Sequence, residues 1–96
     1  MDDKQILTLE TRVARSERLT GSQVDNEWVM IDLESGEYYG LNAIASDIWQ
    51  LLVEPIRVAD LCADLLRRYD VDKERCEGEV LVLLRQMQEK RMLRVV

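Results

Sequence analysis

Residues 37–49 read Glu-Tyr-Tyr-Gly-Leu-Asn-Ala-Ile-Ala-Ser-Asp-Ile-Trp, and this stretch decides the fold. It contains an apolar strand that ends at Leu41, followed by Asn42, whose side chain can cap the first turn of a helix. The preceding residues, 28–36, read as a partner strand and a tight turn, with Gly36 suited to a positive φ. A hairpin that runs directly into a helix predicts an α+β fold of winged-helix type.

The spacing of apolar residues after Asn42 predicts a bundle of three helices. The helices are expected at residues 43–53, 58–69 and 73–91. On the N-terminal side, one strand is expected within residues 5–15, Thr20–Gln23 is expected to be a turn, and residues 92–96 either form a short strand or pack down. The whole chain, 1–96, is therefore predicted to be one domain, with about three antiparallel strands before the three helices.

Composition limits the classes of partner. The chain has 96 residues, enough for one domain with one modest core, and its 47% apolar and 33% charged residues are typical of a globular chain. The net charge of −6 argues against nucleic acid and anionic membranes as main partners, because phosphate binding needs an excess of Lys and Arg. Residues 1–5 are acidic and polar and do not resemble a secretion signal, so we expect a cytoplasmic protein.

The residue types needed for catalysis are sparse. The sequence contains no His, so the usual general base near neutral pH is missing. No base partner is evident for the serines, which are Ser16, Ser22, Ser35 and Ser46. Cys62 and Cys76 do not have metal-ligand spacing and fall on the apolar faces of two helices, so we expect free, buried thiols. The sequence predicts a protein that is not an enzyme and that uses no metal or cofactor.

Two surplus apolar features indicate a binding surface. The first is on the third helix, whose core face is complete without Leu81 and Val82. Leu81 shares its side of the helix with Arg85 and Gln88. This side is either covered by the protein itself or lines an apolar groove.

The second feature is the strand Tyr38–Leu41, which contains no Lys, Pro or charge that would protect an exposed sheet edge. Adjacent Tyr38 and Tyr39 must point to opposite faces of the sheet. An open edge beside an apolar helix is the arrangement that binds an extended peptide as an added strand. The alternative is that the N-terminal or C-terminal strand of the same chain pairs with this edge.

Four short patterns occur in a fixed order along residues 28–93. They are Tyr39-Gly-Leu41-Asn42, Ala45-x-x-Ile48-Trp49, the run Val58, Leu61, Leu65 and Tyr69, and the tail Met92-Leu-Arg-Val95. In this order and spacing they resemble the PqqD-like family, also called RiPP recognition elements. The wording of Asp32–Asn42 is more similar to members from lasso-peptide pathways than to those from pyrroloquinoline quinone pathways. In one departure, Arg91-Met92 stands where family members commonly have a glycine before the final apolar pair.

The resemblance implies a non-catalytic adaptor. Such proteins bind the leader segment of a ribosomally made precursor peptide as an extra strand and present it to tailoring enzymes. For this chain it implies a peptide along Tyr38, Tyr39, Gly40 and Leu41, with Leu81, Arg85 and Gln88 on the helix side of the groove. The implied partners are the precursor leader peptide, a leader peptidase and a cyclase, and the same edge could also pair two copies of the chain into a homodimer.

The alternative function is a winged-helix module that binds DNA or regulates transcription. A DNA-reading helix is expected to be basic and polar. The third helix instead has an apolar middle and nearly balanced charges, namely Lys73, Arg75, Arg85, Lys90 and Arg91 against Glu74, Glu77, Glu79 and Glu89. The sequence therefore favours the peptide adaptor.

Overall fold

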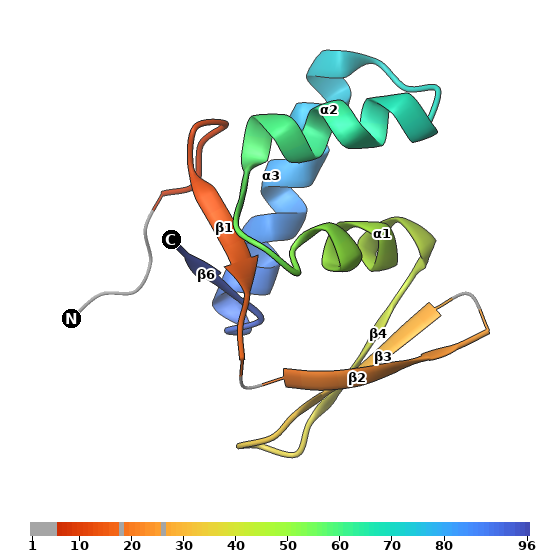
Figure 1. Ribbon diagram of the computed structural model, residues 1–96, viewed down its shortest axis with the longest axis vertical. Helices are drawn as coiled ribbons and strands as arrows, with labels where there is room; N and C mark the ends of the chain where they lie inside the picture. Colours follow the sequence, from red (N-terminus) through yellow and green to blue (C-terminus); the bar gives the residue numbers. More distant parts are fainter. Residues whose placement is uncertain (1–5, 18, 26) are drawn as a thin grey trace.

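The computed structural model describes residues 6–17, 19–25 and 27–96 (Figure 1). In chain order its elements are β1 (Arg12–Arg15), β2 (Leu19–Val24), β3 (Glu27–Asp32), β4 (Tyr38–Leu41), α1 (Ala43–Leu51), β5 (Ile56–Arg57), α2 (Val58–Arg68), α3 (Lys73–Glu89) and β6 (Leu93–Val95). The predicted α+β class, with antiparallel strands and three helices, is confirmed. The N-terminal stretch 1–5, on which the expectation of no secretion signal rests, lies outside the described residues.

The strands form two separate three-stranded sheets, ordered β5-β1-β6 and β2-β3-β4. The first sheet joins the two ends of the domain, since β1 pairs with β6 in the register Val13↔Val95. The second sheet lies on the other side of α1 and forms the lower part of the molecule in Figure 1. Within the described residues, neither β1 nor β6 pairs with β4, so the alternative in which a terminal strand covers this edge is excluded.

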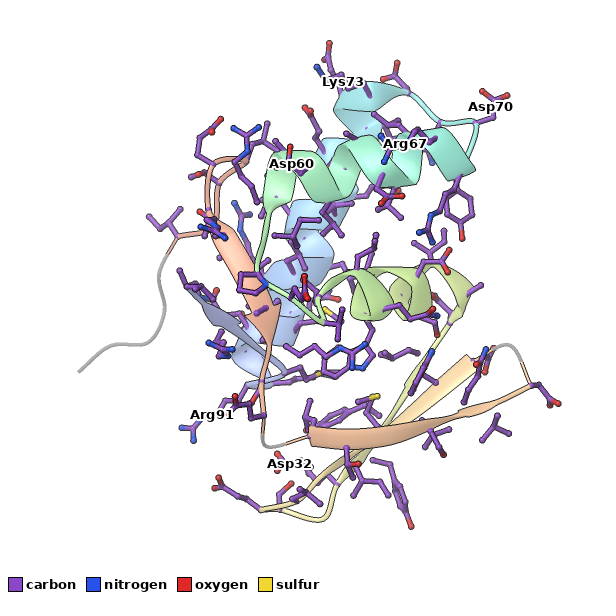
Figure 2. All side chains as sticks on the ribbon, viewed as in Figure 1. Asp32, Asp60, Arg67, Asp70, Lys73 and Arg91 are labelled. Carbon is purple, nitrogen blue, oxygen red and sulfur yellow. The ribbon has the colours of Figure 1, made fainter. Side chains whose placement is uncertain are left out.

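The β3–β4 hairpin is closed by a side-chain cap. Asp32, only 4% exposed, accepts hydrogen bonds from the backbone N–H of Glu34 at 2.9 Å and of Ser35 at 3.4 Å. Gly36 has φ +76°, the left-handed conformation expected for this turn. Figure 2 shows Asp32 at the end of the hairpin that points away from the helices.

The prediction of a turn at Thr20–Gln23 is wrong, because these residues lie within β2, which pairs with β3 along its whole length. Gly21 is needed for packing rather than for turning. A Cβ atom at this position would lie 2.5 Å from the sulfur of Met30 and 2.8 Å from the carbonyl oxygen of Val29. The glycine therefore makes room for Met30, which is 1% exposed in the core.

Helix α1 packs on one face of the β2-β3-β4 sheet, and α2 lies farther from it (Figure 1). Asn42 caps α1 as predicted, with its side-chain oxygen accepting from the N–H of Ala45 at 2.9 Å. The core combines residues from both sheets and all three helices; its largest fully buried side chains include Trp49, Leu7, Met30, Ile48, Leu52, Leu61 and Leu84. No helix in the described part of the chain is both long enough and apolar enough to cross a bilayer.

The turn after α3 explains the departure at Arg91. Arg91 has φ +58°, the left-handed conformation that usually selects glycine. Its N–H donates to the carbonyl of Gln88 at 3.0 Å, and the N–H of Met92 donates to that of Met87 at 2.8 Å. These two bonds form a Schellman motif, so the expected helix-ending turn is made with arginine in the glycine position.

Candidate functional site

The β2-β3-β4 sheet has two edge strands, β2 and β4, and β4 is the one that leads into α1. The N–H of Asp32 donates to the carbonyl of Glu37 at 2.9 Å, which makes these two residues a hydrogen-bonded pair. Bonded and non-bonded pairs alternate along antiparallel strands. From the register Met30↔Tyr39, the backbone groups of Tyr39 face β3, whereas the N–H and C=O groups of Tyr38 and Gly40 face away from the sheet. The edge therefore offers two residues whose backbone can pair with an added strand.

The C-terminal end of this edge is attached to α1 by a hydroxyl group. Ser46, 2% exposed, donates from its Oγ to the carbonyl of Leu41 at 3.1 Å and accepts from the N–H of Trp28 at 3.2 Å. Ser46 thus bridges β3 and β4 at the point where their ladder ends. In the sequence, Ser46 was noted only as a serine without a partner base for catalysis. Its position next to Ala45, on the buried face of α1, was the signal of a structural role.

A groove lies between β4 and the second half of α3. Its volume is about 390 Å³, and its lining comprises Tyr38, Tyr39, Gly40, Leu41, Asn42, Ala45, Leu83, Gln86, Met87, Lys90 and Met92. The two tyrosines point to opposite faces, as predicted: Tyr38 is 73% exposed, whereas Tyr39 packs against the core. The ammonium of Lys90 lies 5.3 Å from the centre of the Tyr39 ring. The groove is therefore apolar near Leu83 and Met87 and carries a cation on its rim.

The predicted site residues separate into two sets. Tyr38, Tyr39, Gly40 and Leu41 all line the groove, but Leu81, Arg85 and Gln88 are not among its lining residues. Leu81 and Leu83 are two positions apart in α3. Such residues differ by roughly 200° around the helix axis, so they lie on nearly opposite sides of the helix.

The helix contribution to the groove comes instead from Leu83, Gln86, Met87 and Lys90, which sequence reasoning missed. Leu81 is half-buried and packs against the core. The apolar surplus of α3 was real, but periodicity alone did not tell which side of the helix faces β4. A contact of Leu81, Arg85 or Gln88 with a peptide stays a prediction.

The two cysteines are buried and free, on facing positions of α2 and α3. Burial raises the pKa of the Cys62 thiol to about 12, and the pKa of Cys76 is also raised by burial. A thiol with a raised pKa is a poor nucleophile at neutral pH. The described residues contain no cluster of three or more His, Cys, Asp or Glu side chains arranged to hold a metal ion.

The chain is similar to one known protein family and to solved structures. Residues 27–93 match the family model described as coenzyme PQQ synthesis protein D (PqqD). A solved structure of TbiB1 in complex with the TbiA(beta) leader peptide has a TM-score of 0.78 and 31% identity, covering 83% of this chain and 93% of that chain. A structure of lasso peptide synthetase B1 complexed with the leader peptide has a TM-score of 0.76 and 28% identity, covering 84% and 95%. No curated protein matches the chain by sequence.

Proposed function

The chain belongs to the family of coenzyme PQQ synthesis protein D, and from this we propose that it binds the leader peptide of a ribosomally made precursor in a lasso-peptide pathway. The observation that carries the proposal is the open edge of β4 beside a groove that is lined by both apolar and polar side chains of α3. Two structures that share this fold were solved with leader peptides bound. On this proposal, the chain recognises a peptide and does not bind DNA.

The peptide binds as a fourth strand of the β2-β3-β4 sheet. The outward N–H and C=O groups of Tyr38 and Gly40 pair with its backbone, which provides affinity with little dependence on side-chain identity. Alternate side chains of the added strand point toward α3, where the half-buried Leu83 offers an apolar contact. Specificity then comes from these side chains and from charge near Lys90.

The chain itself performs no chemistry and acts by delivery. It presents the bound precursor to a leader peptidase and a cyclase, which raises the local concentration of the precursor around these two enzymes. We place this step in the cytoplasm, where thiols such as those of Cys62 and Cys76 stay reduced. A homodimer through β4 would compete with the peptide, because both occupy the same edge.

The test is calorimetry and amide NMR with the synthetic TbiA(beta) leader and with peptides enriched on the immobilised chain from a random display library. We expect binding with saturable amide shifts at Tyr38 and Gly40. A peptide with proline at alternate positions of the binding segment is the matched control, because it lacks the donors that a strand needs. If neither probe binds, or if binding leaves the β4 amides unshifted, the proposal is wrong.

The DNA-binding alternative is tested with the same protein sample. A phosphate-led interface would give binding to random duplex DNA that falls steeply as salt rises. We expect no such binding from a chain with a net charge of −6. Steep salt-dependent binding would favour the regulatory module instead.

A further inference from the structure

The sheet β5-β1-β6 carries exposed arginines on the face that points away from the core. Residues opposite one another in an antiparallel pair share a face, and successive residues of a strand alternate between faces. Arg12 of β1 stands opposite Arg57 of β5. Arg94 of β6 stands opposite Ala14, two residues farther along β1, and so lies on the same face as Arg12. The three arginines are exposed, whereas Val13 on the other face is fully buried; they form the arginine face.

Arg12 lies between two like charges. It is directly opposite Arg57, at the roughly 5 Å Cβ separation of such pairs, and diagonally opposite Arg94, at about 7–8 Å. Arg57 is compensated, since it contacts Glu10 at 2.8 Å and Asp60 at 3.2 Å. In the part of the chain that the structure describes, no carboxylate pairs with Arg12, and Arg94 is bonded only to a backbone carbonyl, at 3.2 Å. Like charges opposite one another destabilise a sheet, so Arg12 costs stability that no contact within the described chain offsets.

The turn that leads into β6 adds another cation beside this sheet. The N–H of Ser16, just after β1, donates to the carbonyl of Met92 at 2.9 Å, which places the neighbouring Arg91 at the end of β1. Arg91 is exposed and points away from the protein (Figure 2). Guanidinium groups thus gather on one small side of a chain whose net charge is −6.

The guanidinium groups select the class of ligand. Their planar donors match carboxylates and phosphates, with which they form paired hydrogen bonds. Nucleic acid fits poorly, because a duplex-binding protein typically neutralises about 6–10 phosphates, more than this face can reach. The net charge of −6 also repels an extended polyanion or an anionic membrane. A short acidic stretch of polypeptide meets the arginine face without meeting the acidic remainder of the surface.

We propose that the arginine face docks an acidic segment of a partner protein, in which Asp or Glu side chains are closely spaced. Carboxylates of the segment pair with Arg12 and Arg94 and relieve the repulsion between them. The field of the chain supports this choice, because an acidic partner is repelled by the negatively charged surface elsewhere and steered to this face.

The arginine face and the β4 edge are separate. They belong to different sheets, which lie on different sides of α1 (Figure 1). One chain can therefore hold a strand at β4 and an acidic partner at the arginine face at the same time. The inference goes beyond the proposed function and does not depend on the binding of a leader peptide.

The experiment titrates poly-L-glutamate onto the full chain, at low and at high salt, and follows the backbone amide and arginine Nε–H resonances. The variants are Arg12→Gln and Arg94→Gln, alone and combined. Lys73→Gln is the matched control, because it removes one exposed positive charge at the other end of α3 from Arg91 (Figure 2). All three positions are exposed, so the fold should tolerate each change.

The expected result has two parts. Poly-L-glutamate should shift the resonances of Arg12 and Arg94, and its binding should weaken as salt rises. Each single arginine variant should weaken binding by about two- to fivefold, the effect of one exposed ion pair, and the double variant by more, whereas Lys73→Gln should change it by less than about twofold. Arg12→Gln should also unfold at a higher urea concentration than the wild type at low salt, because it removes the repulsion.

The opposing results are distinct. No binding at low salt, or equal weakening by Lys73→Gln and Arg12→Gln, would overturn docking at the arginine face. Tighter binding of random duplex DNA or of phosphatidylserine vesicles, lost in Arg12→Gln, would assign the face to another polyanion and overturn the protein partner. Displacement of poly-L-glutamate by the TbiA(beta) leader would show that the two sites are not separate. A leader that fails to bind anywhere would overturn the proposed function and leave the arginine face in place.

Discussion

The hydroxyl of Ser46 in α1 donates a hydrogen bond to the carbonyl of Leu41 at 3.1 Å, and so fixes the end of the open edge strand to the helical core. The same oxygen accepts from the N–H of Trp28 at 3.2 Å. An edge strand without such an attachment would be free to fray or to slip in register. The position of the β4 edge therefore depends on one buried side chain outside it.

Ser46→Ala should lower the free energy of unfolding by about 1–3 kcal/mol, because it leaves the part-buried N–H of Trp28 and the buried carbonyl of Leu41 without their partner. Urea denaturation measures this loss. The control is Ser22→Ala on the exposed strand β2, where we expect a change within about 0.5 kcal/mol. Equal stability of the two variants would mean that the bridge contributes nothing.

Gly40→Pro should reduce peptide affinity while the domain stays folded. The N–H of Gly40 faces away from β3, so proline removes a donor needed by the added strand and none needed by the hairpin. Gly40→Ala is the matched control: its Cβ would meet nothing within 4 Å, and its N–H is kept. Calorimetry should show loss of binding only for the proline variant; similar affinities for both would place the peptide elsewhere.

Leu83→Glu and Leu81→Glu test which side of α3 contacts the peptide. Because Leu83 lines the groove and Leu81 does not, the first change should weaken binding on the order of 2 kcal/mol, about thirtyfold in Kd, by placing a charge against an apolar ligand. Both side chains pack against the core, so each variant is first shown to be folded; folded Leu81→Glu should then keep an affinity close to that of the wild type. A larger loss of affinity in folded Leu81→Glu would restore the side of the helix that the sequence indicated.

Arg91→Gly should raise the free energy of unfolding by about 1 kcal/mol, because Arg91 has φ +58° and a side chain makes this conformation unfavourable. Thermal or urea denaturation provides the measurement. Glu89→Gly, one of the last positions of α3, should change stability in the opposite direction, since glycine disfavours the helix. A loss of stability in Arg91→Gly would show that the arginine side chain makes a compensating contact.

Cys62 should make the domain sensitive to alkali without taking part in binding. Its pKa is raised from 9.0 to about 12 by burial. Below pH 9 the Cys62 thiol keeps its proton in both the folded and the unfolded state, so the free energy of unfolding is at its full value there. As the pH rises toward 12, the unfolded state releases this proton first, and the free energy of unfolding falls by at most about 1.4 kcal/mol per pH unit. Denaturation at stepwise pH should show a shallower decline for Cys62→Ala. Unchanged slopes, or a loss of peptide affinity in this variant, would contradict a structural role.

The sequence predicts local structure well where one signal dominates. The Asn42 cap, the Gly36 turn and the alternation of Tyr38 and Tyr39 each follow from the chemistry of one or two residues, and the structure contains all three. The prediction of a turn at Thr20–Gln23 was wrong because a Gly-Ser pair is typical of turns, whereas here Gly21 makes room for the side chain of Met30 from the neighbouring strand. The same limit applies to the site.

Strand Tyr38–Leu41 could be identified as an exposed edge from its own residues. The side of α3 that faces it depends on how the helix is rotated against the sheet, which is set by packing between distant elements. The cavity lined by Ile44, Leu65 and Val80, among others, could not be predicted for the same reason, since these residues come from three different helices.

The separation of the two sheets has a consequence for how the domain can be joined to others. Strands β1 and β6 hold both ends of the described chain in one sheet, and β6 runs away from the hairpin (Figure 1). A polypeptide fused before β1 or after β6 would extend from that sheet and leave β4 accessible. The domain can therefore be fused through either end to an enzyme without blocking β4. The length of the linker would then set the effective concentration of a peptide bound at β4.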